Sequence, residues 1–365
     1  MPSDRAVTLQ DIADRLGVTR STVSYAITGR GRISPETKQK VLAAARDLGY
    51  QPNTLARRLR GSQTGILALG LPRYTSTMSY YMEATFGVAE EAERAGMIVS
   101  LLTAEVRPAD LKRLHADGVI LLDPDADDPA AWALLSGPIP VVTGELVPPG
   151  MPAGRGAVSS DHATAIVELL DHLAERGAHR PALIIPDIRW YWAMSVRAAF
   201  ETWCRERDIV ARVSTIPHPA TADHVRSRVA DLLTGGAQAA DAIVAGSDGI
   251  VLNVVTSAEL GGRRVGEDLL VATVVDSEIL TLTRPSITAL DLHPREFGHR
   301  CVRTLLAALG SAGTDAASAD DARTDDAAGG DGPGGFRHDV VPIDLRRRES
   351  TLGLSTSEAT PHQCG

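Results

Sequence analysis

The stretch TLQDIADRLGVTRSTVSYAIT, residues 8–28, decides the fold of the N-terminal part of the chain. Thr8 is a residue type that caps helices, and Asp11, three positions later, completes a capping-box pattern. Apolar residues then recur at the helical period, and those on one face are Leu9, Ile12, Ala13 and Leu16. Gly17 follows, and glycine accepts the left-handed conformation that such a turn needs. The pattern predicts a short helix that ends in a tight turn.

Two further helices are predicted after this turn. Thr19 caps the second helix, whose inward residues are expected to be Val23, Ala26 and Ile27. The residues left mostly outward are Arg20, Ser21, Thr22, Ser24 and Tyr25. The third helix begins at SPET, with Ser34 as cap and Pro35 at the first helical position, and Gly49 stops it. Its expected buried stripe is Val41, Leu42, Ala45 and Leu48.

This order of helices is the one that places a second, recognition helix in the major groove of DNA. Its outward residues are short hydroxyls and an arginine, which suit phosphates and base edges. The contacts predicted in this head are Thr8, Thr19, Arg20, Ser21, Thr22, Ser24 and Tyr25. The alternative is a generic three-helix bundle with a polar outer face.

The charge distribution favours a DNA-binding head. Residues 1–61 contain eleven Lys and Arg against five Asp and Glu, a net charge of +6. The remainder of the chain holds 26 basic and 41 acidic residues, a net charge of −15. A basic head on an acidic body indicates that only the head meets a polyanion.

The segment NTLARRLRG, residues 53–61, is predicted to be a short hinge helix with Ala56 and Leu59 on one side. A leucine without a core can wedge between base steps in the minor groove, and the flanking arginines would neutralise phosphates. A helix this short is marginal alone, so it is expected to form only when two copies pack together on DNA. The alternative is a soluble linker. The contacts predicted here are Asn53, Ala56, Arg57 and Leu59.

From Ile66 onward the pattern changes to short apolar runs that alternate with helix-like segments. Strand-length runs include GILALGL, MIVSLLT, GVILL, IPVVT, PALIIP, ADAIVAG and DLLVATVV. Such alternation predicts parallel sheets covered on both faces. About 300 residues suffice for two doubly wound lobes, with ligands at the carboxyl ends of the strands, in the crevice between the lobes.

The segments TLQDIADRLGVTRSTVSYAITG, ISPETKQKVLAAARDLGYQPN and ARRLRG closely resemble the head of the LacI/GalR family of bacterial transcription regulators. The resemblance implies that Arg20, Ser21 and Tyr25 read bases, and that Leu59 is the minor-groove wedge. Body segments such as ADGVILL, AIVAGSDGIVLNVV and LRRREST extend it at lower identity and imply a periplasmic-binding-protein-like fold.

The predicted organisation is therefore a helix-turn-helix DNA-binding domain at 1–52, a hinge helix at 53–61, and a two-lobed effector-binding and dimerisation core at 62–365. The segment between SLLT and ADGVILL is short, so one helix of the first lobe is expected to be truncated. Residues 311–335 are rich in Gly, Ala and Asp without apolar periodicity, which predicts a disordered surface loop.

Effector-binding candidates are placed just past strand ends. Tyr80, Tyr81, Asp161 and Asp276 match ligand-lining positions of the family, Asp248 lies in GSDG, and Arg197 stands near the family's ligand-binding arginine. Trp190 belongs to a run of three aromatic residues after PALIIP. Aromatic faces with carboxylates suit a sugar or another polyhydroxylated or heterocyclic ligand.

Other classes of function are poorly supported by the sequence. No catalytic elbow, Walker loop or HExxH motif is present, and no cofactor is implied. His162, His172 and His179 have no facing acid or cysteine cluster, so no metal site is predicted and exposed histidines are expected. Three scattered cysteines indicate reduced thiols, and no apolar run suggests a membrane span or a secretion signal.

The sequence thus predicts a cytoplasmic, homodimeric regulator, a repressor, that binds a near-palindromic double-stranded operator. A small-molecule effector, a sugar or a related metabolite, would modulate its operator affinity. A co-repressor mode, in which ligand strengthens DNA binding, stays open. The alternative from another class is a solute-binding protein of an uptake system, for which a basic head has no use.

Overall fold

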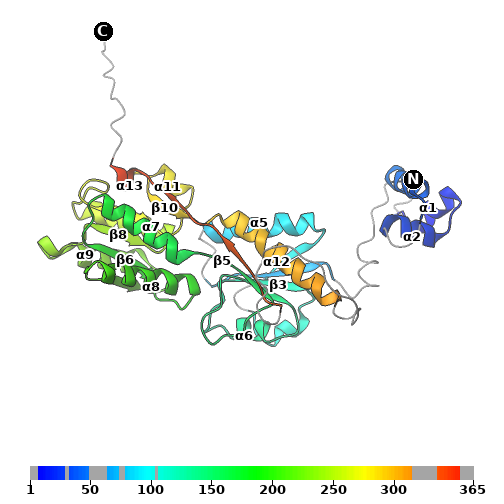
Figure 1. Cartoon of the computed structure of the whole chain (residues 1–365), viewed down its shortest axis with the longest axis horizontal. Helices are drawn as coiled ribbons and strands as arrows, with labels where there is room; N and C mark the ends of the chain where they lie inside the picture. The colour runs from blue at the N-terminus through cyan, green and yellow to red at the C-terminus, as the bar shows by residue number, and fades with distance from the viewer. Residues whose placement is uncertain are drawn as a thin grey trace, which may run out of the picture. The chain divides into compact units, whose positions relative to one another are not determined.

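The computed structural model describes residues 7–28, 33–48, 64–73, 79–102, 106–314 and 335–353. The chain divides into two compact units, Met1–Thr64 and Gly65–Gly365 (Figure 1). The predicted hinge helix at 53–61, with its proposed contacts Asn53, Ala56, Arg57 and Leu59, lies outside the described residues.

The head contains three helices, α1 (Leu9–Leu16), α2 (Arg20–Thr28) and α3 (Pro35–Asp47). The predicted capping box is confirmed: the Thr8 amide donates to Asp11 Oδ2 at 2.7 Å, and the Thr8 hydroxyl accepts from the Asp11 amide at 3.3 Å. Gly17 has φ 64°, as the turn requires, and Ser34 caps α3 ahead of Pro35. Local signals in the sequence therefore define all three helices.

The head has its own small core, which joins all three helices. Its buried members are Ile12, Ala13, Val23, Ala26, Val41, Ala44 and Ala45. One prediction is wrong: Leu42 is 38% exposed, and Ala44 is buried instead. Since one residue turns a helix by about 100°, Leu42 leaves the face that Val41, Ala44 and Ala45 share. Its leucine side chain faces solvent.

The first lobe of the body is built on a parallel sheet with the order β11-β5-β4-β3-β1-β2. Its strands are β1 (Ile66–Gly70), β2 (Ile98–Leu102), β3 (Gly118–Leu122), β4 (Val141–Gly144), β5 (Gly156–Ser160) and β11 (Arg337–Val341). Its helices are α5 (Ser79–Arg94), the 3₁₀ helix η1 (Asp110–Arg113), α6 (Pro129–Leu135) and α12 (Pro294–Thr314). Between β2 and β3 the described residues contain only η1, in line with the expected truncation.

Both faces of this sheet are covered, because alternate strand residues point to opposite sides. Leu67, Ile120 and Val142 pack in one cluster with α5 and α12, whereas Ala68 and Val119 pack in another with α6. The strands are therefore apolar throughout, as a parallel sheet between helical layers requires.

The second lobe has the sheet order β12-β10-β9-β8-β6-β7, parallel except for β12, which pairs antiparallel with β10. Its strands are β6 (Pro181–Pro186), β7 (Arg212–Ile216), β8 (Ala242–Ala245), β9 (Leu270–Thr273), β10 (Thr288–Asp291) and β12 (Asp344–Arg346). Its helices are α7 (His162–Glu175), α8 (Tyr191–Glu206), α9 (Ala222–Leu233), η2 (Gly236–Gln238), α10 (Asp248–Leu260), α11 (Ile279–Leu282) and α13 (Glu349–Leu352). The predicted pair of doubly wound lobes is confirmed.

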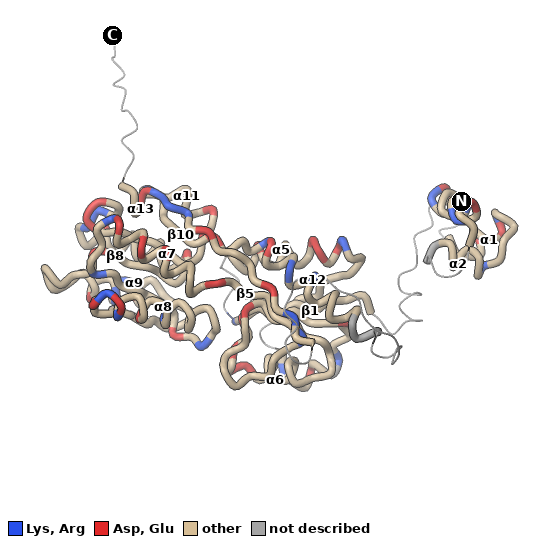
Figure 2. The backbone as a smooth tube through the Cα atoms, in the orientation of Figure 1, with Lys and Arg blue, Asp and Glu red and all other residues tan. Residues whose placement is uncertain are grey.

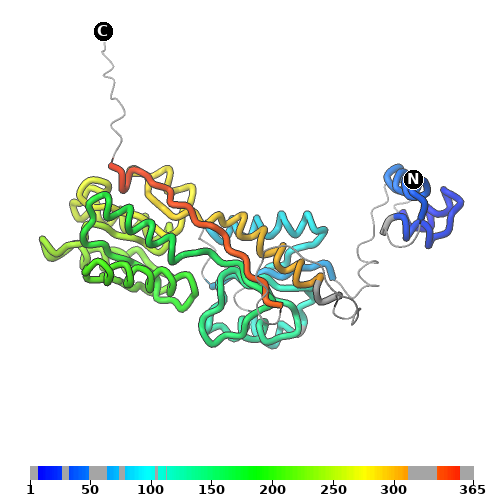
Figure 3. The backbone as a smooth tube through the Cα atoms, viewed as in Figure 1, coloured from blue at the N-terminus to red at the C-terminus, as the bar shows by residue number. Residues whose placement is uncertain are grey.

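The chain passes between the lobes three times (Figure 3). The crossings lie between β5 and α7, between β10 and α12, and between β11 and β12. Each lobe is thus assembled from segments far apart in sequence. Three short connections are the only covalent links between the lobes in the described part of the body, which permits one lobe to rotate against the other.

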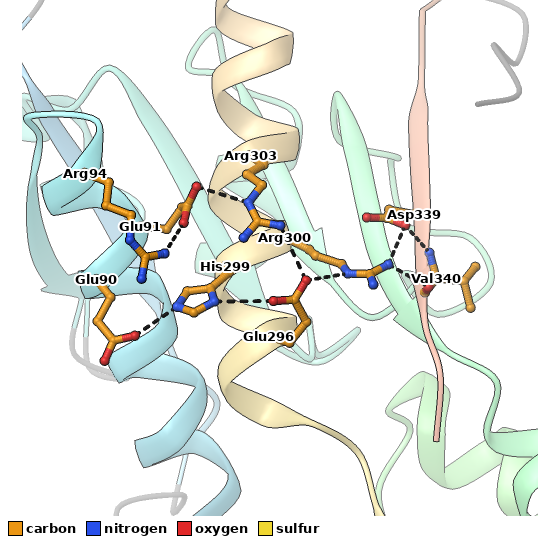
Figure 4. A network of polar contacts seen from close by, with 9 residues as sticks. All are labelled: Glu90, Glu91, Arg94, Glu296, His299, Arg300, Arg303, Asp339 and Val340. Carbon is orange, nitrogen blue, oxygen red and sulfur yellow. Dashed lines mark hydrogen bonds and ion pairs between the residues drawn. The ribbon is translucent and has the colours of Figure 1, made fainter. Parts of the chain in front are cut away.

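Helix α12 ties the first lobe together. Gly87 of α5 and Gly298 of α12 sit where a Cβ atom would collide with the backbone of the facing helix, so only glycine allows this close approach. Acidic and basic residues occur along both α5 and α12 (Figure 2), and several of them form ion pairs between the two helices. Arg303 pairs with Glu91 at 3.0 Å, and Arg300 reaches Asp339 of β11 at 3.1 Å (Figure 4).

The predicted loop at 311–335 begins later than expected. Residues 311–314 belong to α12, which ends at Thr314. Residues 315–334 lie outside the described part of the chain. Helix α12 is stabilised by the packing of its earlier turns, and the small residues at 311–314 do not stop it. The helix therefore extends past the point where the apolar periodicity ends.

Candidate functional site: the recognition helix and the crevice

Helix α2 presents a polar face in the head. Val23 and Ala26 are fully buried on its inner side, whereas Arg20 and Ser21 are exposed and Tyr25 is 51% exposed. The Thr19 hydroxyl accepts from the Thr22 amide at 3.1 Å. Thr19 and Thr8 thus hold helix ends in place. An arginine, a serine and a tyrosine remain free of the head core and available to base edges and phosphates.

A cavity of about 230 Å³ lies at the carboxyl ends of β6 and β8 in the body. Its polar lining includes Ser247, Asp248, Asn253 and His218. Asp248 Oδ2 accepts a hydrogen bond of 2.8 Å from the hydroxyl of Ser79, which belongs to the first lobe. This cavity, called here the large cavity, therefore opens beside a direct contact between the lobes.

Two indole rings form the aromatic wall of the large cavity. Trp190 and Trp192 flank the start of α8, directly after β6. Trp190 is buried, the centroid of its ring lies 5.3 Å from that of His218, and its Nε1–H has no hydrogen-bond partner among the described residues. A buried donor without a partner is costly, so a ligand acceptor at this position would be favoured.

A second cavity, of about 20 Å³ and called here the small cavity, lies between the lobes. From the first lobe it is lined by Tyr80, Tyr81, Asp123 and Glu145. Its lining from the second lobe is His162 at the start of α7, Trp192, Val274 and Val275, together with Leu292 at the crossing after β10. Trp192 borders both cavities, so the two form neighbouring parts of one crevice.

The acids of the small cavity are held by strained backbone and by hydrogen bonds. Asp123 follows β3 with φ 41°, and Glu145 follows β4 with φ 74°, both in the left-handed region. The Tyr81 hydroxyl donates to Asp123 Oδ2 at 2.7 Å, and His162 Nε2 lies 3.0 Å from Glu145 Oε1. Asp123 Oδ1 and Glu145 Oε2 are buried and accept no hydrogen bond from the part of the chain that the structure describes.

Burial controls the protonation of this cluster. Burial, together with the charge of Glu145, raises the pKa of Asp123 to about 7. Burial alone would lower the pKa of His162, but the facing Glu145 carboxylate outweighs it and the pKa is raised. Burial raises the pKa of both Tyr80 and Tyr81 well above the ordinary value, so both hydroxyls stay neutral donors. Near neutral pH the cluster is able to gain or lose a proton.

The structure brings four of the seven predicted effector residues to the crevice. Trp190 and Asp248 line the large cavity, and Tyr80 and Tyr81 line the small one. The remaining three, Asp161, Arg197 and Asp276, line neither cavity.

Each of these three is engaged elsewhere. Asp161 is exposed and caps α7 by accepting from the Thr164 amide at 3.1 Å. Arg197 points from α8 toward Glu201, one helical turn along. Asp276 forms a two-pronged ion pair with Arg348, at 2.6 and 2.7 Å. An effector contact at these three residues therefore stays a prediction, and it has no support from the lining of either cavity.

The crevice residues that sequence reasoning missed are Asp123, Glu145, His162, His218 and Asn253, whereas Trp192 belongs to the aromatic run expected there. Asp123 directly follows the predicted strand GVILL and Glu145 lies two residues after IPVVT, a signal that could have revealed both. The expectation of exposed histidines is wrong for His162 and for His172, which is buried against the Thr351 hydroxyl at 2.8 Å. His179 is exposed.

No group of three His, Cys, Asp or Glu side chains suited to a metal ion occurs among the described residues. Cys204 and Cys301 are buried free thiols, and Cys364 lies outside the described part. No helix within the described ranges is long and apolar enough to cross a membrane.

Two family models match the chain. Residues 8–53 match the model described as bacterial regulatory proteins, lacI family, and residues 170–324 match the periplasmic binding protein-like domain. The HTH-type transcriptional regulator CelR of Thermobifida fusca is 27% identical over 86% of this chain and 95% of its own length.

Solved structures agree on the fold. A transcriptional regulator CelR–cellobiose complex has a TM-score of 0.66 at 25% identity and covers 94% of this chain and 99% of its own. A lac repressor dimer bound to operator and an anti-inducer has a TM-score of 0.70 at 20% identity, with 95% and 100% covered.

A head with a recognition helix, joined to a two-lobed body with a lined crevice, defines a DNA-binding transcription regulator with an effector site. The chain belongs to the lacI family of bacterial regulatory proteins. Its matched relatives are named as regulators rather than enzymes.

Proposed function

We propose that the protein is a homodimeric repressor whose operator affinity is set by a small molecule bound in the crevice. The observation that carries this proposal is that the small cavity is lined from both lobes and shares Trp192 with the large cavity, where Asp248 accepts a hydrogen bond from Ser79 of the first lobe. A ligand that contacts both lobes stabilises one lobe arrangement over another by its differential contacts. The lobes would rotate against each other about the three crossings, and this rotation would change how the two heads of the dimer bind the operator.

The DNA contacts of this proposal start from α2. Arg20, Ser21 and Tyr25 are its base-reading residues, supported by their exposure on the side opposite Val23 and Ala26. Two heads of a dimer would occupy half-sites about one helical turn apart on a near-palindrome. The proposed hinge contacts Asn53, Ala56, Arg57 and Leu59 would act at the centre of that site, with the two leucines wedged between base steps.

The effector proposed for the crevice is a polyhydroxylated small molecule, a sugar or a related metabolite. Trp190 and Trp192 contribute aromatic rings to the large cavity, and the Trp190 Nε1–H has no partner among the described residues. Asp248 and Asn253 contribute polar groups to the same cavity. Apolar walls with a few convergent polar groups are typical of such sites. The resolved cellobiose complex of a similar regulator supports this ligand class.

The test uses the full chain in two stages. Selection of bound duplexes from a random pool would yield the operator, and fluorescence anisotropy would then measure its affinity during titration with sugars. A repressor with an inducer loses operator affinity on titration, whereas a gain would show a co-repressor. Equal binding to every duplex at moderate salt would overturn the proposal, since nonspecific binding rests on phosphates alone.

The proposal also includes that the protein binds its effector without converting it. The protein would act in the cytoplasm, where the operator is found. Recovery of the effector unchanged after prolonged incubation would support it. Conversion of the effector would instead show an enzyme on this fold. A role in solute uptake is disfavoured by the net charge of +6 on residues 1–61, which an uptake protein has no need to carry.

A further inference from the structure

We propose that the small cavity is a subsite for a protonated amine, so that the effector is a polyol carrying a basic nitrogen. This inference rests on the proposed effector site and narrows its ligand class. Its basis is the pair of carboxylates Asp123 and Glu145, which are only 4% and 2% exposed. Each has one buried oxygen without a hydrogen-bond partner among the described residues, and both residues line the small cavity.

The charge balance of the cavity calls for a cation. Among the residues that line it, His162 is the only group able to carry a positive charge, and it is committed to Glu145 at 3.0 Å. Tyr80 and Tyr81 also line the cavity, and their hydroxyls stay neutral. The rest of the lining is an indole and aliphatic side chains, from Trp192, Val274, Val275 and Leu292. With both acids ionised and His162 protonated, one negative charge is left buried, and a buried charge is strongly unfavourable unless it is paired.

The size of the cavity selects a small group. About 20 Å³ is room for one water-sized group. An ammonium group has that size and donates three hydrogen bonds, which would satisfy both unpartnered oxygens at once. A hydroxyl donates only one and leaves the net charge uncompensated, so an amine fits the acids better than the sugar hydroxyl does.

Proton linkage gives this subsite a distinct signature. Asp123 holds a proton below about pH 7, because burial and Glu145 raise its pKa. The charged groups around it are Glu145 and His162, with the neighbouring Asp161. The side chains of Tyr80, Tyr81 and Cys301 stay neutral, because burial raises the pKa of each. When Asp123 or His162 loses a proton, the charge of the cavity becomes more negative. Amine affinity should therefore rise with pH, by at most about tenfold per pH unit for one proton released.

The experiment measures thermal unfolding of the full chain with methylammonium chloride as probe. Potassium chloride at equal ionic strength controls for salt, and tetramethylammonium chloride, which is too large for the cavity and has no N–H donor, controls for size. We expect a saturable rise in Tm with methylammonium only, stronger at pH 8 than at pH 6. Asp123→Asn and Glu145→Gln should each weaken the apparent affinity at least tenfold.

The matched control is Asp127→Asn, which removes the same charge from an exposed position four residues away. Its methylammonium response should equal that of the unaltered chain. No specific rise in Tm, or an equal rise in the two cavity variants, would show that the cavity holds water alone and overturn the subsite. Failure of the chain to prefer any duplex would overturn the proposed regulator instead, because the methylammonium measurement does not involve DNA.

Discussion

Replacing Asp123 by asparagine is expected to stabilise the body, by an amount that depends on pH. Burial, aided by the charge of Glu145, raises the pKa of Asp123 from 3.8 to about 7. The unfolded chain therefore ionises this acid at a lower pH than the folded chain does. Between these two pKa values stability is lost as pH rises, and above pH 7 the loss is complete. A difference of this size corresponds to about 4 kcal/mol of unfolding free energy.

Asparagine keeps the shape of Asp123 and has no charge to bury. Its amide oxygen can still accept from Tyr81, although a hydrogen bond to a charged acceptor is replaced by a neutral one, at a cost of about 1 kcal/mol. The advantage of Asp123→Asn over the unaltered chain should grow by about 2 to 3 kcal/mol from pH 5 to pH 8. It should level off above pH 7, where the folded acid is ionised too.

Urea unfolding followed by tryptophan fluorescence measures this difference, because all four tryptophans of the chain lie in the body. The comparison needs one protein concentration throughout, since dimers gain stability with concentration. Asp127→Asn should show no such pH trend. A difference between Asp123→Asn and the unaltered chain that stays constant from pH 5 to pH 8 would refute a buried, ionisable Asp123.

Three further predictions concern DNA and effector binding. Thr8→Ala removes one half of the capping box with Asp11, so the head should lose about 1 kcal/mol of stability in a thermal melt followed by circular dichroism; an unchanged melt would contradict the cap. Leu59→Ala should keep nonspecific DNA binding and lose most operator preference in a gel-shift series, and equal loss of both would argue against the wedge. Trp190→Ala should abolish the effector response in anisotropy while operator affinity without effector persists; a normal response would remove Trp190 from the site.

The helices of the head were predictable because their signals are local. Thr8, Gly17 and Ser34 act on backbone groups within a few residues, and a 3.6-residue repeat selects the buried face. Among the head residues whose burial is described, Leu42 was misplaced, because a stripe of apolar positions is wider than the small core that three short helices share. In the body, the runs GVILL and PALIIP coincide with β3 and β6, since a strand buried on both faces must be apolar throughout.

The crevice was predicted only in part, since its residues meet through long-range packing. A carboxylate after a strand can cap a helix, as Asp161 does, or face a cavity, as Asp123 does, and the local sequence is similar in both cases. The role of Asp276 depends on Arg348, 72 residues later in the chain. Histidine polarity suggested exposure, yet Glu145 holds His162 in the interior.

By itself, the sequence determined the three helices of the head, their polar recognition face, the separation of a basic head from an acidic body, and the alternation of strands and helices in two lobes. These features follow from capping, periodicity and charge, which act over short stretches of chain. The tertiary structure alone decided which acids and indoles meet between the lobes, and which polar groups are left without partners there. That outcome depends on three crossings that bring distant strand ends together, and no local pattern records where those ends will meet.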